Sequence, residues 1–234
     1  MHGAVFAKGG DAVLVATHGG LFEVTSTRVE RVGQPHDLMG FAAGPGDDLL
    51  ASGHPSAAGL PSPAGLMVST DGGRTWTVRS RGGESDFHAL SAAGAGAVGF
   101  DGQVRVSTDT RTWAEGSIDA EPFALAADRS GQTVMATTEK GLRRSTDGGR
   151  SFTAVAGAPL LLLVAHAGAT RFIGATPRGE LWVSDDGGTT WAQRAGEPGV
   201  PQALAARGDD VALVTDARVL VSKDGGATLQ PLRR

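Results

Sequence analysis

The sequence predicts an all-β protein, a six-bladed β-propeller with four antiparallel strands in each blade, which spans residues 1–234 as a single domain. Three observations lead to this prediction. A glycine-rich turn recurs at nearly constant spacing, a short apolar segment precedes each copy, and the 234 residues divide into six units of about 39 residues. With 36 glycines and few apolar positions at helical spacing, the chain is expected to consist of short strands and turns.

The recurring turn is most complete in "STDGGRTW", residues 69–76. Its Asp-Gly-Gly supplies residues that tolerate a positive φ, as a tight turn requires, and the Trp returns to extended structure. The other copies are "STDTRTW" from Ser107, "STDGGRSF" from Ser145, "SDDGGTTW" from Ser184 and "SKDGGATL" from Ser222. Successive copies begin 38 or 39 residues apart, and this regularity indicates a repeat architecture.

Each repeat contains four short strands, and the turn lies between the third and the fourth. The third strands read "LMV", "VRV", "LRR", "LWV" and "VLV"; "LFEV" at Leu21 is a sixth, whose turn has decayed to "TSTRVERV". Units that cannot bury both faces alone cover one another when arranged about an axis as propeller blades. A solenoid is the alternative, but neither end shows a polar capping repeat. Each blade is expected to be complete, without a strand exchanged between the termini.

The pattern S-x-D-x-G-x-T-W resembles the Asp box, or BNR repeat, of sialidase-like propellers. The resemblance implies that the boxes lie between the third and fourth strands, on the face opposite the usual active site. It also implies that Asp71 accepts hydrogen bonds from the backbone N–H groups of its own turn, and that Trp76 packs between blades. The boxes are then structural, with calcium ligation as the alternative.

A narrower resemblance concerns the segments "THGGLFEV", "DLMGF", "ASGHP" and "DFHAL". They are similar to segments of small exported bacterial six-bladed propellers, which are often labelled glycosylhydrolase or exo-alpha-sialidase because of their boxes. This resemblance implies an extracellular or periplasmic location.

Composition and charge argue against several classes of function. The net charge of −4 and the lack of a Lys/Arg cluster argue against binding to nucleic acid or to an anionic membrane. The absence of Cys excludes disulfides and thiolate metal sites. The longest strongly apolar run, Leu160 to Val164, is too short to span a bilayer. The protein is expected to be a monomer.

Aligning the six units by their inner strands gives one position in each blade whose side chain is expected to point into the central channel. These positions hold His2, Met39, His88, Phe123, Leu162 and Gln202. Two residues earlier, hence on the same strand face, stand Asp37, Asp86 and Glu121 in blades two to four.

Two further histidines are expected near this end of the channel, because they occupy loops between second and third strands. His18 follows "LVAT", and His54 opens the long loop "HPSAAGLPSPAG", which its three prolines stiffen. His36 and His166 fall outside the alignment and are expected on the surface or on the opposite face.

The convergence of these side chains on three adjacent blades predicts a metal site. Its ligands would come from His2, His18, Met39, His54 and His88. Neutral imidazoles with a thioether favour copper over zinc or magnesium. Apolar neighbours (Phe87, Phe123 and Leu162) suit Cu(I), and Asp37 or Asp86 would orient an imidazole. The alternative is that each histidine forms ordinary hydrogen bonds in a water-filled channel.

Other functions remain open alternatives. Asp37, Asp86 and Glu121 recur at one level on neighbouring blades, near the carboxylate spacing of an inverting glycosidase, which makes a glycoside hydrolase one of them. Resemblance to sialidases would imply a Tyr nucleophile and three arginines, but the chain has no Tyr and no aligned trio of Arg, so sialidase activity is not expected. A protein-binding scaffold or assembly factor, or a small ligand at the channel mouth, is a further alternative to a non-catalytic metal-binding propeller.

Overall fold

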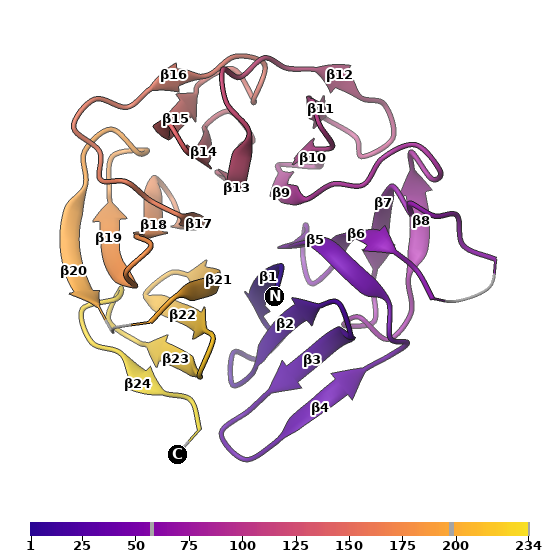
Figure 1. The fold of residues 1–234 in the computed structure, drawn as a ribbon, viewed down its shortest axis with the longest axis horizontal. Coiled ribbons are helices and arrows are strands. Elements are labelled where there is room, and N and C mark those ends of the chain that lie inside the picture. The colour runs from indigo at the N-terminus through magenta and orange to yellow at the C-terminus, as the bar shows by residue number, and fades with distance from the viewer. Residues whose placement is uncertain (57–58, 197–198, 234) are drawn as a thin grey trace.

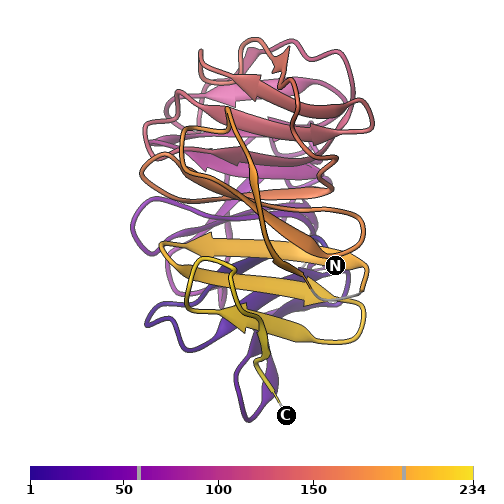
Figure 2. The same cartoon turned by 90° about the vertical axis from the view of Figure 1, so that its left-hand side faces the viewer.

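Six four-stranded antiparallel sheets form a ring around a central channel (Figure 1). The structure is a computed structural model that describes residues 1–56, 59–196 and 199–233. Figure 2 shows the strands running across the ring, from one face to the other. In every sheet four consecutive strands follow one another from the channel outward. The predicted fold class and the predicted number of blades are therefore confirmed.

The first three blades cover the first half of the chain. Blade one contains β1 (Gly3–Phe6), β2 (Val13–Thr17), β3 (Gly20–Val24) and β4 (Val29–Val32). Blade two contains β5 (Asp37–Ala43), β6 (Leu49–His54), β7 (Leu66–Ser69) and β8 (Thr77–Ser80). Blade three contains β9 (Ala89–Ala93), β10 (Gly96–Phe100), β11 (Val104–Ser107) and β12 (Ala114–Glu115).

The remaining blades have the same organisation. Blade four contains β13 (Pro122–Ala127), β14 (Val134–Thr138), β15 (Gly141–Ser145) and β16 (Thr153–Ala154). Blade five contains β17 (Leu163–Gly168), β18 (Arg171–Ala175), β19 (Glu180–Ser184) and β20 (Ala192–Gly196). Blade six contains β21 (Pro201–Arg207), β22 (Asp210–Thr215), β23 (Val219–Ser222) and β24 (Gln230–Pro231). No strand is exchanged between the two ends of the described chain, as the repeat phase predicts.

The hydrophobic core lies between neighbouring blades. Leu21 of blade one packs in one cluster with Met67 and Trp76 of blade two, so the predicted position of Trp76 between blades is confirmed. The ring closes in the same way, because Val13 and Val214 belong to a cluster shared by blades one and six. Each fully buried side chain of this size contributes about 1.5–3 kcal/mol of hydrophobic stabilisation. Contacts between blades are therefore the main source of stability.

Near the channel the blades approach so closely that some positions have no room for a side chain. A Cβ added at Gly40 would lie 2.3 Å from the backbone oxygen of Phe87 in the next blade. A Cβ at Gly99 would lie 2.5 Å from the Phe87 ring, which stacks on Trp113 with ring centroids 4.9 Å apart. Glycine at these two positions allows Phe87 to be fully buried between blades two and three.

The Asp boxes hold their turns through one carboxylate each. Oδ1 of Asp71 accepts hydrogen bonds from the backbone N–H groups of Arg74 and Thr75, at 3.0 and 2.9 Å, and from the Ser69 hydroxyl at 2.8 Å. Its Oδ2 accepts a hydrogen bond of 2.6 Å from the Thr75 hydroxyl. These bonds, that from the Thr75 hydroxyl first among them, lower the pKa of Asp71 to about 2. The predicted bonding of Asp71 to its own turn is confirmed.

The boxes lie on the face of the ring where the first and second strands of each blade are joined. Backbone N–H groups of Gly148, Gly187 and Gly225 donate hydrogen bonds to carbonyl groups in those joining turns, on Gln132, Thr170 and Asp209. We call this the box face. The inner strands begin on the opposite face, which we call the top face. The predicted placement of the boxes between third and fourth strands is confirmed.

His36 is neither on the surface nor on the box face, so this expectation was wrong. It lies in the connection from β4 to β5 and is 4% exposed. Its Nδ1 accepts a hydrogen bond of 3.2 Å from the backbone N–H of Ser56, in the long loop after β6, whose hydroxyl donates to the Pro35 carbonyl. Burial lowers the pKa of His36, because a buried imidazole resists gaining charge.

Within the described residues, no helix is long and apolar enough to cross a membrane.

Replacing the box aspartate tests how much the turn contributes. Because the pKa of Asp71 is lowered to about 2, its contribution to stability is complete above about pH 4 and is lost as pH falls toward 2. We expect Asp71→Asn to lower the free energy of unfolding at pH 7 by about 1 kcal/mol, a value kept small by solvent exposure. Chemical denaturation at pH 7 and at about pH 3 checks this, since the difference from wild type must shrink in acid.

The matched control is Asp11→Asn, because Asp11 is exposed and lies on the same face, outside any box. Equal destabilisation by Asp11→Asn and Asp71→Asn, or a difference that grows in acid, would contradict the role of the box carboxylate.

A second variant tests the buried histidine. Since the pKa of His36 is lowered on folding, the unfolded chain takes up a proton there first as pH falls. The stabilisation is complete above about pH 6.5 and is lost as pH drops through the lowered pKa. We expect His36→Gln, which keeps an acceptor for the Ser56 N–H, to flatten the stability profile between about pH 7 and 5. Denaturation at both values measures the slope. Measurements between about pH 8 and 7 are the control, since the stability of the wild type and that of the variant are expected to change with pH at the same slope there. If His36→Gln leaves the slope of the free energy of unfolding against pH unchanged between about pH 7 and 5, the prediction is wrong.

Candidate functional site

The channel opens into two cavities, one at each face. The larger, about 610 Å³, lies at the box face, where the inner strands end, and its polar lining includes Ser91, Arg129, His166 and Arg207. The smaller, about 90 Å³, lies at the top face and is lined by the starts of the inner strands. His166 therefore lies at the box face, which is one of the two locations that the sequence predicted for it. The candidate residues from the sequence concern the smaller cavity.

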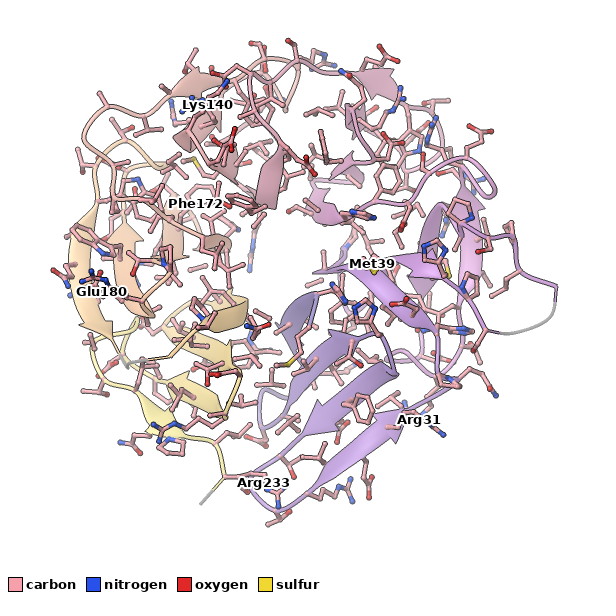
Figure 3. All side chains as sticks on the ribbon, viewed as in Figure 1. Arg31, Met39, Lys140, Phe172, Glu180 and Arg233 are labelled. Atoms are coloured by element: carbon pink, nitrogen blue, oxygen red, sulfur yellow. The ribbon has the colours of Figure 1, made fainter. Side chains whose placement is uncertain are left out.

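Four of the six aligned inner positions line the small cavity: His2, His88, Phe123 and Gln202. In blade five the lining residues are Leu163 and Val164 rather than the expected Leu162, and Met39 is not among the lining residues. Figure 3 shows Met39 on the side of the channel that blade two forms.

The inner positions of blades two, four and six lie at irregularities in strand pairing. Pairing of β5 with β6 skips Met39, pairing of β13 with β14 skips Phe123, and pairing of β21 with β22 skips Gln202. In blades one and three, His2 and His88 immediately precede the inner strand and donate their backbone N–H to the second strand. A bulge changes the direction of its side chain, so equivalent positions in the alignment do not present their side chains identically.

Three polar side chains from two blades form the first group, which we call the His2 group: His2, His18 and Asp37. The Nε2 atoms of His2 and His18 are 3.0 Å apart, and Nδ1 of His18 is 2.8 Å from Oδ1 of Asp37. Ligand atoms of the three residues all lie within 4.8 Å of one another. The two rings meet edge to face, with centroids 4.3 Å apart. His2 precedes β1, His18 lies between β2 and β3, and Asp37 begins β5.

Hydrogen bonding assigns the protons in this group. A carboxylate only accepts, so Nδ1 of His18 carries the proton donated to Asp37. The Nε2 of neutral His18 then presents a lone pair, and Nε2–H of His2 donates to it. Burial, followed by the positive charge of the N-terminus and the charge that His18 carries when protonated, lowers the pKa of His2. His2 is thus held as the neutral imidazole, which is the form that coordinates a metal.

A second group, the Asp86 group, consists of His54, Asp86 and His88. Oδ2 of Asp86 lies 3.1 Å from Nε2 of His54 and 2.9 Å from Nε2 of His88. The Nδ1 of His54 is 3.2 Å from the Ser62 hydroxyl in the long loop after β6. The other oxygen of Asp86 is buried and, among the described residues, has no hydrogen-bond partner. One carboxylate oxygen therefore joins the end of β6 in blade two to the residue that precedes β9 in blade three.

The histidines selected from the sequence therefore gather on one face but in two groups. His2 and His18 share Asp37, whereas His54 and His88 share Asp86. The groups are close enough for charge on His88 to lower the pKa of His2. Sequence reasoning considered Asp37 and Asp86 only as possible orienting or catalytic groups and overlooked Ser62. Both carboxylates stand two residues before an inner residue, and this shared position could have identified them as hydrogen-bond partners of the histidines.

Comparison with known proteins adds to this picture. The family model described as BNR/Asp-box repeat matches residues 67–78, the box of blade two. No curated protein sequence matches the chain. A structure of YCF48 bound to D1 peptide has 16% identity and a TM-score of 0.54, over 94% of this chain and 77% of that one. A chain of a nidogen–laminin complex has 11% identity and a TM-score of 0.69, over 94% and 91%.

An ancestral GH74 enzyme has 16% identity and a TM-score of 0.58, over 98% of this chain but only 37% of the enzyme. At such identities the likeness concerns the fold. Two of these three neighbours are complexes with a peptide or protein, and the third is an enzyme. The repeat match, the boxes and the six sheets agree with one another. The chain is a six-bladed β-propeller that carries Asp-box repeats, one of which the BNR/Asp-box family model matches.

Proposed function

We propose that the chain is a non-catalytic binding propeller whose His2 group holds a transition-metal ion, with copper as the ion. The observation that carries the proposal is the 3.0 Å separation of the Nε2 atoms of His2 and His18. Two imidazole nitrogens at this separation fit the approximately 2.0–2.1 Å bonds that each makes to one ion. The third member, Asp37, bonds to the far side of the His18 ring.

The contact between Asp37 and His18 supports a metal site in a specific way. Metal-binding histidines commonly donate their second ring N–H to a carboxylate, which fixes the tautomer and the orientation of the ring. Asp37 does this to His18, whose Nε2 lone pair faces His2. Coordination requires only that His2 move its proton from Nε2 to Nδ1, so both nitrogens would then present lone pairs to the ion.

The choice of copper follows from the donors. Two imidazole nitrogens suit divalent ions of the later first transition series, and Cu²⁺ forms the most stable complexes in that series. The thioether of Met39, two residues after Asp37 on β5, is a candidate additional donor for Cu(I). We further propose an extracellular or periplasmic location, which rests on the resemblance to small exported propellers.

A glycoside hydrolase is less well supported by the same face. Oxygens of Asp37 and Asp86 accept hydrogen bonds from imidazoles, which engages them with histidines instead of a sugar. Glu121 is exposed at the start of blade four. The small cavity of about 90 Å³ is also well below the 300–1,000 Å³ typical of small-molecule sites.

Metal titration of protein prepared without a His tag tests the proposal. We expect Cu²⁺ to bind at one site and more tightly than Zn²⁺, as measured by calorimetry and by elemental analysis after dialysis. His18→Ala should lower the affinity by more than about 100-fold, and Asp37→Asn by about 10–100-fold, because the latter only orients a ligand. His166→Ala, on the box face, is the matched control. Binding that survives His18→Ala, or that His166→Ala weakens equally, would place the ion elsewhere.

The pH dependence provides a second test. Protons compete with the ion for imidazole, so the affinity for Cu²⁺ should fall steadily below about pH 6. Because the pKa of His2 is lowered, proton competition at this ligand begins at a lower pH than for an ordinary histidine. Titrations at about pH 7.5, 6 and 5 measure the trend. The His18→Ala variant is the control, as it should show little specific binding to lose. Affinity that stays constant down to about pH 4.5 would mean that imidazole is not a ligand.

A further inference from the structure

The larger cavity, at the box face, has mostly apolar walls and an apolar floor. Six buried residues, one from each blade, line both cavities: Ala4, Phe41, Leu90, Leu125, Val164 and Leu204. The two cavities therefore meet at these residues, which we call the apolar ring. Besides Ala4, nine lining residues of the larger cavity are alanines, and their short side chains account for its volume of about 610 Å³. Sites for small molecules typically have volumes of roughly 300–1,000 Å³.

Arg207, at the end of β21, is a cationic group held in position at this cavity. Its guanidinium carbon lies 5.3 Å from the centroid of the Phe6 ring in blade one, and both residues line the cavity. An aromatic face stabilises a cation placed over it. Gly10 leaves the space for the guanidinium, because a Cβ added there would collide with Nη2 of Arg207. The side chain of Arg207 therefore extends from blade six over blade one.

The contacts of Arg207 leave most of its donors available to a ligand. Its Nη2 lies 3.5 Å from Oδ2 of Asp210, whose Oδ1 lies 3.1 Å from Nζ of Lys223, so two cations share this carboxylate. A guanidinium has five N–H donors, and in the described part of the chain Arg207 uses only one of them, in this long contact. Arg129 also lines the cavity and, among the residues that the structure describes, has no side-chain hydrogen bond or ion pair.

Negative charge at the same mouth limits how much charge a ligand can carry. Asp128 lines the cavity, and its Oδ1 accepts hydrogen bonds from the Ser130 hydroxyl at 2.7 Å and from the backbone N–H of Gln132 at 3.1 Å. Asp48 packs beside the lining residue Gly44. Because these carboxylates repel a multiply charged anion, the site favours a ligand with a single negative charge.

We propose that the box-face cavity binds a small carboxylic acid that has an apolar body, such as an aromatic ring. The ligand carboxylate accepts hydrogen bonds from the guanidinium of Arg207, whose planar fork matches two carboxylate oxygens. The apolar body extends between the alanines toward the apolar ring, where it is removed from water. This site lies on the opposite face from the His2 group and does not depend on a metal ion.

Calorimetric titration of the full chain with naphthoate, an aromatic carboxylate, tests the proposal in buffer that contains a chelator. We expect one site that binds naphthoate about tenfold or more tightly than naphthamide, the neutral compound of the same shape. Arg207→Gln should weaken naphthoate binding about tenfold and leave naphthamide binding nearly unchanged, because only the carboxylate needs the cation. Ala43→Phe, which places a ring at an exposed lining position, should weaken the binding of both compounds.

The matched control is Arg79→Gln, because Arg79 is an exposed arginine on the outer strand β8 and does not line the cavity. Thermal unfolding of each variant checks that the ring is intact. The proposal is overturned if naphthoate shows no saturable binding below about 1 mM, or if naphthamide binds as tightly. It is also overturned if Arg79→Gln weakens naphthoate binding as much as Arg207→Gln, or if Ala43→Phe leaves it unchanged. The chelator keeps these results independent of the proposed copper site.

Discussion

Contact between the faces of neighbouring blades is the interaction on which the rest of the structure depends. A four-stranded blade has two apolar faces, and each is covered only by the next blade, as Leu21 and Met67 show between blades one and two. Near the axis this contact is so close that Gly40 has no space for a Cβ. The top-face groups follow from it as well, because His18 of blade one reaches Asp37 of blade two only while the two blades are packed together.

The parts of the fold that local chemistry determines could be predicted from the sequence. An Asp box is closed by its own backbone, so Asp71 could be assigned without knowing its neighbours. The periodicity of the boxes then gave the number of blades. The burial of His36 could not be predicted in this way, because it depends on a contact with Ser56, twenty positions away in a loop of irregular sequence.

Prediction of the candidate site was limited for the same reason. The alignment identified the inner positions, yet the bulges at Met39, Phe123 and Gln202 depend on how two strands pair, which periodicity does not specify. The division of the histidines into two groups depends on side-chain directions, since one oxygen of Asp86 lies between two rings. The sequence was enough to predict the type of each residue and the blade that holds it, whereas the hydrogen-bond partner of each imidazole could be assigned only from the structure.

The closure of the ring has a mechanical consequence. At every other interface the polypeptide itself crosses from the outer strand of one blade to the inner strand of the next, so a covalent link backs up the side-chain contacts. Blades one and six are joined through side chains such as Val13 and Val214, without a shared sheet. The seam between blades one and six therefore depends on side-chain packing alone, whereas every other interface within the described chain also has a covalent connection.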